Sequence, residues 1–380
     1  MVVPIFIETL LIMMLGAVDT IMLSQYSDES VAAVGVVNQI VMFAFLIFEV
    51  INIGTSVLCS QYLGAKMQKN MVQVVGVALL FNLVVGLLIS AILHYGATTL
   101  LGWMGLRPEL LKYGIGYMQI VGAFAFFQAI SFTISASLRS ANKAIYPMLV
   151  TVLVNIMNII GNYILIYGKF GIPEMGLLGA GISTLASRIM MVIVFALIFF
   201  CTKRYHIYKE GFVHSKINRA DFIYLNKLGW PIALQMGMET ASFSLSAIMV
   251  GWIGTTALAA HQIMLAISQV CFMMYYGMGA AVAVRVSNFN GQNDRVNVRR
   301  TAYSGFHIML GIALIGALPI FLLRHQLGGW FSDSQAVSVT VAQLIIPFIV
   351  YQFGDGLQIN FANALRGIAD VKPMMYIAFI

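Results

Sequence analysis

Long apolar runs recur along the whole chain, and they constrain its fold more than any other feature. Each run is about 20 residues long, which as an α-helix is enough to cross a hydrocarbon layer about 30 Å thick. The chain is 60% hydrophobic and only 9% charged, whereas soluble proteins are about half apolar and about a quarter charged. Because backbone polar groups must find partners within the segment in lipid, the runs predict membrane-spanning helices.

The apolar runs predict ten complete spans and the beginning of an eleventh. The complete spans cover residues 2–24, 33–58, 71–95, 113–138, 145–168, 179–201, 229–253, 260–285, 301–323 and 340–364. The eleventh begins near Pro373 and reaches Ile380.

The chain also contains the same pattern twice, at a constant offset of 227 residues. Pro4 falls on Pro231, Gly64 falls on Gly291, and Leu138-Arg139 falls on Leu365-Arg366. Two membrane-embedded repeats in the same order are typical of secondary transporters, whose substrate sites lie between the halves. We therefore expect an all-α integral membrane fold of two pseudo-symmetric six-helix bundles, related as parallel repeats. The second bundle is expected to be truncated, lacking most of helices 11 and 12.

The longest polar segment divides the repeats and fixes the expected domains. These are an N-terminal six-helix lobe at 1–201, a cytoplasmic connector at 202–228 and an incomplete C-terminal lobe at 229–380. Sixteen Lys and Arg residues fall on the connector side of the membrane. The opposite side has four, which are Arg107, Lys112, Lys169 and Arg324. This bias predicts a cytoplasmic N-terminus, and it explains the net charge of +7 without a nucleic-acid partner.

The sequence shows no motif for catalysis or for nucleotide binding. Cys59, Cys201 and Cys271 are scattered in apolar surroundings, which argues against a disulfide framework or a metal site. There is no Gly-x-x-x-x-Gly-Lys-Ser/Thr run, so transport would have to be driven by an ion gradient. There is also no zinc-ligand, Ser-His or Asp-rich diphosphate motif. We expect no cofactor and no enzymatic activity.

Ionisable residues inside the spans are costly and call for a partner or a purpose. They are Glu8, Asp19, Glu49, Arg188, Glu239 and Asp355. At about 1.5 Å per residue, Glu239 and Asp355 both lie about 15 Å from the cytoplasmic ends of their helices, and Tyr351 is one turn from Asp355. Two close carboxylates in low dielectric suit a monovalent cation or a shared proton. We predict a coupling-ion site at these three residues, with a structural role as the alternative.

A second polar set shares one depth in the outer half of the N-terminal lobe. It consists of Asp19, Asn158, Asn162 and Thr184. A polar or cation site facing the lobe interior would require such a set; the alternative is that the Asn and Thr only bond across helices. Glu8 lies close enough to the cytoplasmic end to snorkel or to bond a neighbour, which favours a structural role.

At these residues the chain resembles the multidrug and toxic compound extrusion (MATE) family, in its NorM-like bacterial branch. The resemblance is carried by Val18 to Met22, Gln61 to Ala65, Leu138 to Lys143 with Pro147, Asn158 to Asn162, Gly179 to Thr184 with Ser187-Arg188, and Ala260 to Gln262. It implies that Glu239, Asp355 and Tyr351 form a cation site, often sodium-coupled and sometimes proton-coupled. It also implies that Asp19, Asn158, Asn162 and Thr184 form the N-lobe site. Some relatives carry an acid where this chain has Asn162.

The resulting prediction is a secondary active antiporter in the bacterial inner membrane, acting as a monomer and conferring antibiotic resistance. It would export organic cations and amphipathic toxicants in exchange for inward Na⁺ or H⁺, through rocking of the two lobes. Two alternatives stay open. One is a lipid-linked glycan flippase of the same superfamily, whose cavity needs many basic residues, while here only Arg188 lies at the midplane. The other is a non-functional truncated fragment.

Overall fold

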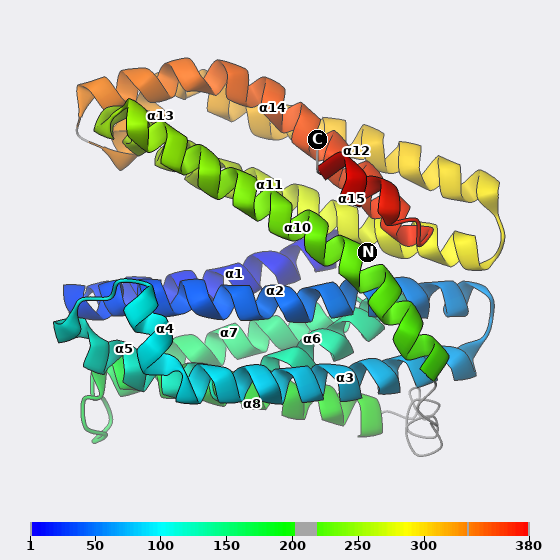
Figure 1. Cartoon of the computed structure of the whole chain (residues 1–380), viewed down its shortest axis with the longest axis horizontal. Coiled ribbons are helices and arrows are strands. Elements are labelled where there is room, and N and C mark those ends of the chain that lie inside the picture. Colours follow the sequence, from blue (N-terminus) through cyan, green and yellow to red (C-terminus); the bar gives the residue numbers. More distant parts are fainter. Residues whose placement is uncertain (1, 202–218, 333, 379–380) are drawn as a thin grey trace. The chain divides into compact units, whose positions relative to one another are not determined.

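The structure is a computed structural model that describes residues 2–201, 219–332 and 334–378 (Figure 1). In this part of the chain there are fourteen α-helices and no strand. Along the sequence they are α1 (Val2–Ser24), α2 (Asp28–Gly64), α3 (Gln68–Tyr95), α4 (Ala97–Trp103), α5 (Pro108–Val121), α6 (Ala125–Ser140), α7 (Ile145–Ile166), α8 (Gly176–Cys201), α10 (Arg219–Ile253), α11 (Thr255–Gly291), α12 (Arg295–Leu322), α13 (Arg324–Phe331), α14 (Gln335–Gly367) and α15 (Lys372–Ala378).

The predicted all-α membrane fold is confirmed. Among the described residues, eight helices are long and apolar enough to cross a membrane, or nine if α5 and α6 together form one span. The expected span at 229–253 lies in α10, which is not one of the eight. Polar residues inside this helix, among them Glu239, Thr240 and Ser244, lower its apolar character.

The chain forms two compact units, one of residues 7–229 and one of residues 2–6 with 230–380. Of the expected connector, residues 202–218 lie outside the described residues. The rest of it, 219–228, is the helical start of α10. Apolar side chains explain this helix: the Phe222 ring packs 5.0 Å from that of Phe81, and Leu225 is buried.

The duplication is visible in the helix boundaries. Helices α2, α3, α5 and α7 each have a counterpart that begins 227 residues later, namely α11, α12, α14 and α15. Backbone turns repeat as well. Residues other than glycine seldom adopt a positive φ, and four of the five described residues that do so form two pairs at this offset. The pairs are Lys66 (61°) with Asn293 (59°), and Asn142 (59°) with Ala369 (64°). Both units therefore use the same local turns between equivalent helices.

One break distinguishes the two units. The single span expected at 113–138 is instead two helices, α5 and α6, which meet at an angle of 43°. Its counterpart in the second unit, α14, is one helix. At the break, a Cβ on Gly122 would lie 2.8 Å from the Cβ of Leu93, and Arg188 donates a 2.7 Å hydrogen bond to the carbonyl of Val121. A glycine and a buried cation thus accommodate the C-terminal end of α5.

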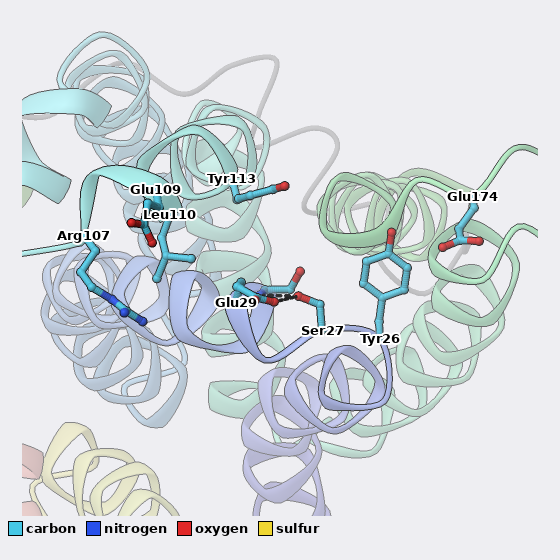
Figure 2. A pocket seen from close by; sticks show the side chains of 9 residues that line it. Tyr26, Ser27, Glu29, Arg107, Glu109, Leu110, Tyr113 and Glu174 are labelled. Carbon is cyan, nitrogen blue, oxygen red and sulfur yellow. Dashed lines mark hydrogen bonds between the residues drawn. The ribbon is translucent and has the colours of Figure 1, made fainter.

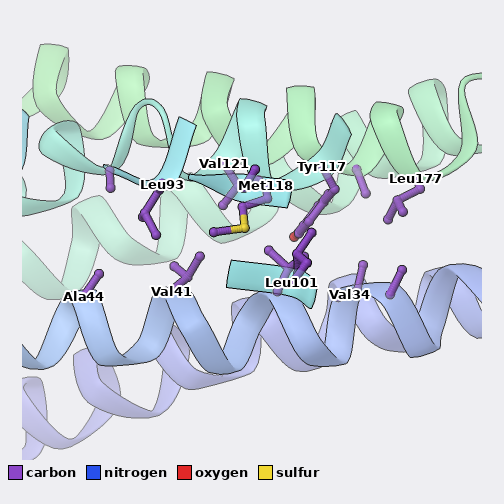
Figure 3. Packing of buried hydrophobic residues seen from close by; sticks show 14 of the residues in the cluster. Val34, Val41, Ala44, Leu93, Leu101, Tyr117, Met118, Val121 and Leu177 are labelled. Carbon is purple, nitrogen blue, oxygen red and sulfur yellow. The ribbon is translucent and has the colours of Figure 1, made fainter. Parts of the chain in front are cut away.

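The core of the first unit lies where α2, α3, α4, α5 and α8 meet (Figure 3). Tyr117, Met118 and Leu101 are each at most 1% exposed. Leu101 belongs to the short helix α4, whose last residue, Trp103, is exposed. This packing holds α8, which carries Thr184, against α5.

Candidate functional site

In the first unit, three helices bring Asp19, Asn158, Asn162 and Thr184 together. All four side chains are at most 3% exposed. The Asn162 Nδ2 donates to Asp19 Oδ1 at 2.6 Å, and the Thr184 hydroxyl donates to Asp19 Oδ2 at 3.0 Å. Asn158 Oδ1 lies 3.3 Å from the Asn162 Nδ2. Both oxygens of the Asp19 carboxylate, on α1, are thus held by donors from α7 and α8.

The close approach of α7 and α8 places these donors. Gly161 leaves room for the side chain of Ser183, whose hydroxyl donates to the Asn158 carbonyl at 3.0 Å. The Oδ1 atom of Asn162 has no hydrogen-bond partner among the described atoms. Buried acceptors are nearly always paired, and oxygens from carboxylate, amide and hydroxyl groups suit a hard cation. The donor set therefore fits a monovalent cation as well as a proton.

Removing the amide of Asn162 is expected to destabilise the first unit. Asn162→Ala deletes the shortest hydrogen bond to the buried Asp19 carboxylate, and hydrogen bonds to charged groups contribute about 2 kcal/mol. Asn155→Ala, on the same helix, removes only a bond to the carbonyl of Thr151 and is the matched control. Thermal unfolding of both purified variants measures the difference, and equal losses would contradict the expectation.

The second unit brings together the other predicted set, Glu239, Asp355 and Tyr351. Glu239 lies on α10 and Asp355 on α14, and their carboxylates interact electrostatically. The Tyr351 hydroxyl hydrogen-bonds to the side chains of Asp355 and Ser268. Glu239 and Asp355 are half-buried, and Tyr351 is 41% exposed. Two acids and a phenol on two helices thus form one cluster.

Two amides that sequence reasoning missed also belong to this cluster. Gln358 Nε2 donates to Glu239 Oε1 at 2.6 Å, and Gln235 Nε2 donates to the same oxygen at 3.1 Å. Gln235 is four residues before Glu239, so helical spacing could have found it. Neither amide carries a charge, so neither stands out in an apolar span as an ionisable residue does. Both amides thus hold the same oxygen of the Glu239 carboxylate.

Two further buried ionisable residues of the first unit, Glu8 and Arg188, have partners of their own. Glu8 is 2% exposed, accepts a hydrogen bond from Ser135 and lies 3.9 Å from the Arg139 guanidinium. Glu8 therefore bonds to neighbouring side chains, which is one of the two structural roles expected for it. The Arg188 guanidinium lies 5.1 Å from the ring centre of Phe45, which is a cation–π contact.

A cavity of about 710 Å³ lies at the loops of the first unit (Figure 2). It is lined by Tyr26, Ser27, Glu29, Ser30, Arg107, Glu109, Leu110, Tyr113 and Glu174. Partial burial raises the pKa of the Tyr26 hydroxyl, and the nearby Glu174 carboxylate raises it further. None of the predicted site residues lines this cavity, so it is separate from both polar sets.

A duplicated bundle of apolar helices, with buried polar residues in each unit, is the architecture of a multi-pass membrane transporter. Comparison with known proteins defines the class more closely. The MatE family model matches residues 4–164 and 231–380. The chain belongs to the MatE family, as the motifs predicted, and it is a transporter and not an enzyme.

Individual relatives agree with this assignment. The chain is 32% identical over 385 residues to the uncharacterized transporter YisQ of Bacillus subtilis (strain 168), covering 99% of this chain and 82% of YisQ. It is 31% identical over 375 residues to the multidrug resistance protein PmpM of Pseudomonas aeruginosa, covering 98% of this chain and 78% of PmpM.

Solved structures share the fold at lower sequence identity. A crystal structure of MATE in the bent conformation matches with a TM-score of 0.90 and 21% identity, covering 99% of this chain and 82% of that one. The outward-facing conformation of a multidrug resistance MATE family transporter of the MOP superfamily matches with a TM-score of 0.89 and 21% identity, covering 99% and 83%.

Proposed function

We propose that this transporter is a secondary active multidrug efflux antiporter, which exports organic cations and other amphipathic toxicants in exchange for inward Na⁺ or H⁺. The observation that carries the proposal is the cluster of Glu239, Asp355 and Tyr351 inside the second unit. Membrane-embedded acids are costly and usually mark ion pathways. The multidrug resistance proteins among the relatives, such as PmpM, support drug export.

Coupling would arise from binding of the ion to this cluster. Two carboxylates that interact in a half-buried site favour the uptake of one positive charge, either a proton or Na⁺. The carboxylate oxygens of Glu239 and Asp355, with the Tyr351 hydroxyl, would hold Na⁺. Binding of the ion favours one conformation and binding of the drug favours the other, so that each promotes release of the other. Asp19 and its three partners offer a second ion site in the first unit.

The proposal includes the bacterial inner membrane as the location, a cytoplasmic N-terminus and a monomeric transporter. The positive-inside distribution of Lys and Arg supports the orientation.

Efflux from membrane vesicles tests this function. Purified protein is reconstituted with a fluorescent organic cation inside, and Na⁺ and pH gradients are imposed separately. We expect at least one gradient to accelerate efflux above that of protein-free vesicles, and the effective gradient identifies the coupling ion. Efflux that responds to neither gradient would contradict antiport.

A further inference from the structure

Glu8 is a buried acid that has no role in the antiport mechanism proposed above. It lies on α1 and contacts two residues of α6, accepting a hydrogen bond from Ser135 on Oε1. Its other oxygen, Oε2, lies 3.9 Å from Arg139 Nη1 and has no hydrogen-bond partner among the described atoms. One oxygen of a buried carboxylate is thus available to take up a proton.

The second unit contains the same contact with an amide in place of the acid. Gln235 and Arg366 follow Glu8 and Arg139 by the repeat offset of 227 residues, and Arg366 Nη2 donates to Gln235 Oε1 at 3.3 Å. The uncharged amide of Gln235 thus joins α10 to α14. Joining α1 to α6 through Arg139 therefore does not require a carboxylate at position 8. The acid adds the ability to bind and release a proton.

The surroundings of Glu8 favour a proton over a metal cation. A buried carboxylate is costly when it is ionised and incompletely hydrogen-bonded, and protonation of Oε2 removes that charge. Arg139 is the charged group that acts on Glu8 among the described residues, and its positive charge disfavours a metal ion beside it. Within the described part of the chain, Ser135 is the one hydroxyl bonded to the carboxylate, which gives too few oxygens for a cation shell.

Helix α1 connects this acid to the other polar site of the first unit. Asp19 is eleven residues after Glu8, which is about three turns and about 16 Å along the helix. The two acids therefore lie on the same face of α1, one held by α6 and the other by α7 and α8.

We propose that Glu8 is a proton-binding site of the first unit, with Ser135 and Arg139 as the positioning residues. Oε2 takes up one proton from the aqueous phase to give the neutral acid, and returns it to the aqueous phase when the ion pair with Arg139 re-forms. This proposal rests on the proposed antiport, because it adds a proton to the ions bound in the transport cycle.

Infrared difference spectra of the purified transporter between mildly acidic and mildly alkaline buffer test the proposal. A protonated carboxyl has its own C=O stretching band, and we expect Glu8→Gln to remove the intensity of one carboxyl per chain. Glu109→Gln, the same change at an exposed position, is expected to leave the bands of buried carboxyls unchanged. Identical spectra of the wild type and Glu8→Gln would overturn the proposal, because Glu8 would then be a permanently ionised structural partner of Arg139.

A second variant keeps the test decisive if Glu8→Gln does not fold. Glu8→Asp retains a carboxyl, so its band is expected to remain but to move in frequency, and an unmoved band would overturn the assignment. The spectra do not depend on transport, so the two proposals can fail separately. Wild-type vesicles without gradient-driven efflux would refute antiport even if the Glu8 band is present. Gradient-driven efflux without such a band would refute only the proton site.

Discussion

Asp355→Asn is expected to abolish efflux driven by an ion gradient, while the protein still folds and inserts. The substitution preserves the size of the side chain but removes one of the two interacting charges of the cluster. Without that charge, the coupling ion no longer distinguishes the two conformations. Coupling free energies of about 1–3 kcal/mol correspond to changes of about 5- to 150-fold, so gradient-driven efflux is expected to fall to the level of protein-free vesicles.

The control for this substitution lies close by in the sequence. Asp370 follows the end of α14 and is exposed, so Asp370→Asn is expected to preserve efflux. The double variant Glu239→Gln with Asp355→Asn removes both charges of the cluster. Unchanged efflux by this double variant, measured in the same vesicles, would refute the coupling role of the two acids.

Gly179→Ala is expected to destabilise the first unit by about 3 kcal/mol, the upper end of the cost of overpacking. Helices α7 and α8 approach so closely here that an added Cβ would lie 2.6 Å from both the carbonyl carbon and oxygen of Leu165. These are backbone atoms, which cannot move aside as a flexible side chain does. The helices must separate, and the Asp19 site that they build must loosen with them.

An identical substitution with open space around it provides the comparison. Gly35 lies in α2, and an added Cβ would meet nothing within 4 Å, so Gly35→Ala is expected to be neutral or slightly stabilising because alanine favours helix. Thermal unfolding of the two variants in the same detergent measures the difference. Comparable midpoints would show that the α7–α8 contact tolerates an extra methyl group.

The helices and their duplication could be predicted because lipid leaves the backbone few alternatives. A run of about 20 apolar residues must form a helix there, and the offset that aligns Pro4 with Pro231 also aligns the starts of α2 and α11. The bend between α5 and α6 could not be predicted, because it depends on how Gly122 fits against Leu93 and on a hydrogen bond from Arg188, 67 residues away from Val121.

Depth along each helix was enough to group the polar residues, but not to find their contacts. Counting residues from the helix ends placed Asp19 level with Asn162 and Thr184, and the structure joins these side chains by hydrogen bonds. The contacts of Glu239 with Gln358 and of Glu8 with Arg139 depend on which helix faces which. That information is absent from the spacing along a single helix. The role of either set in ion binding remains a prediction.

The break between α5 and α6 has a mechanical consequence. A continuous helix resists bending through its ladder of backbone hydrogen bonds, and a kink with unpaired ends lowers that resistance. In the first unit this weak point lies at the Val121 carbonyl that Arg188 holds, whereas the equivalent α14 is unbroken but has Pro347 inside it, which removes one backbone hydrogen bond from its ladder. A chain built from near-copies thus bends at different places in its two repeats, at a side-chain hydrogen bond in the first and at a proline in the second.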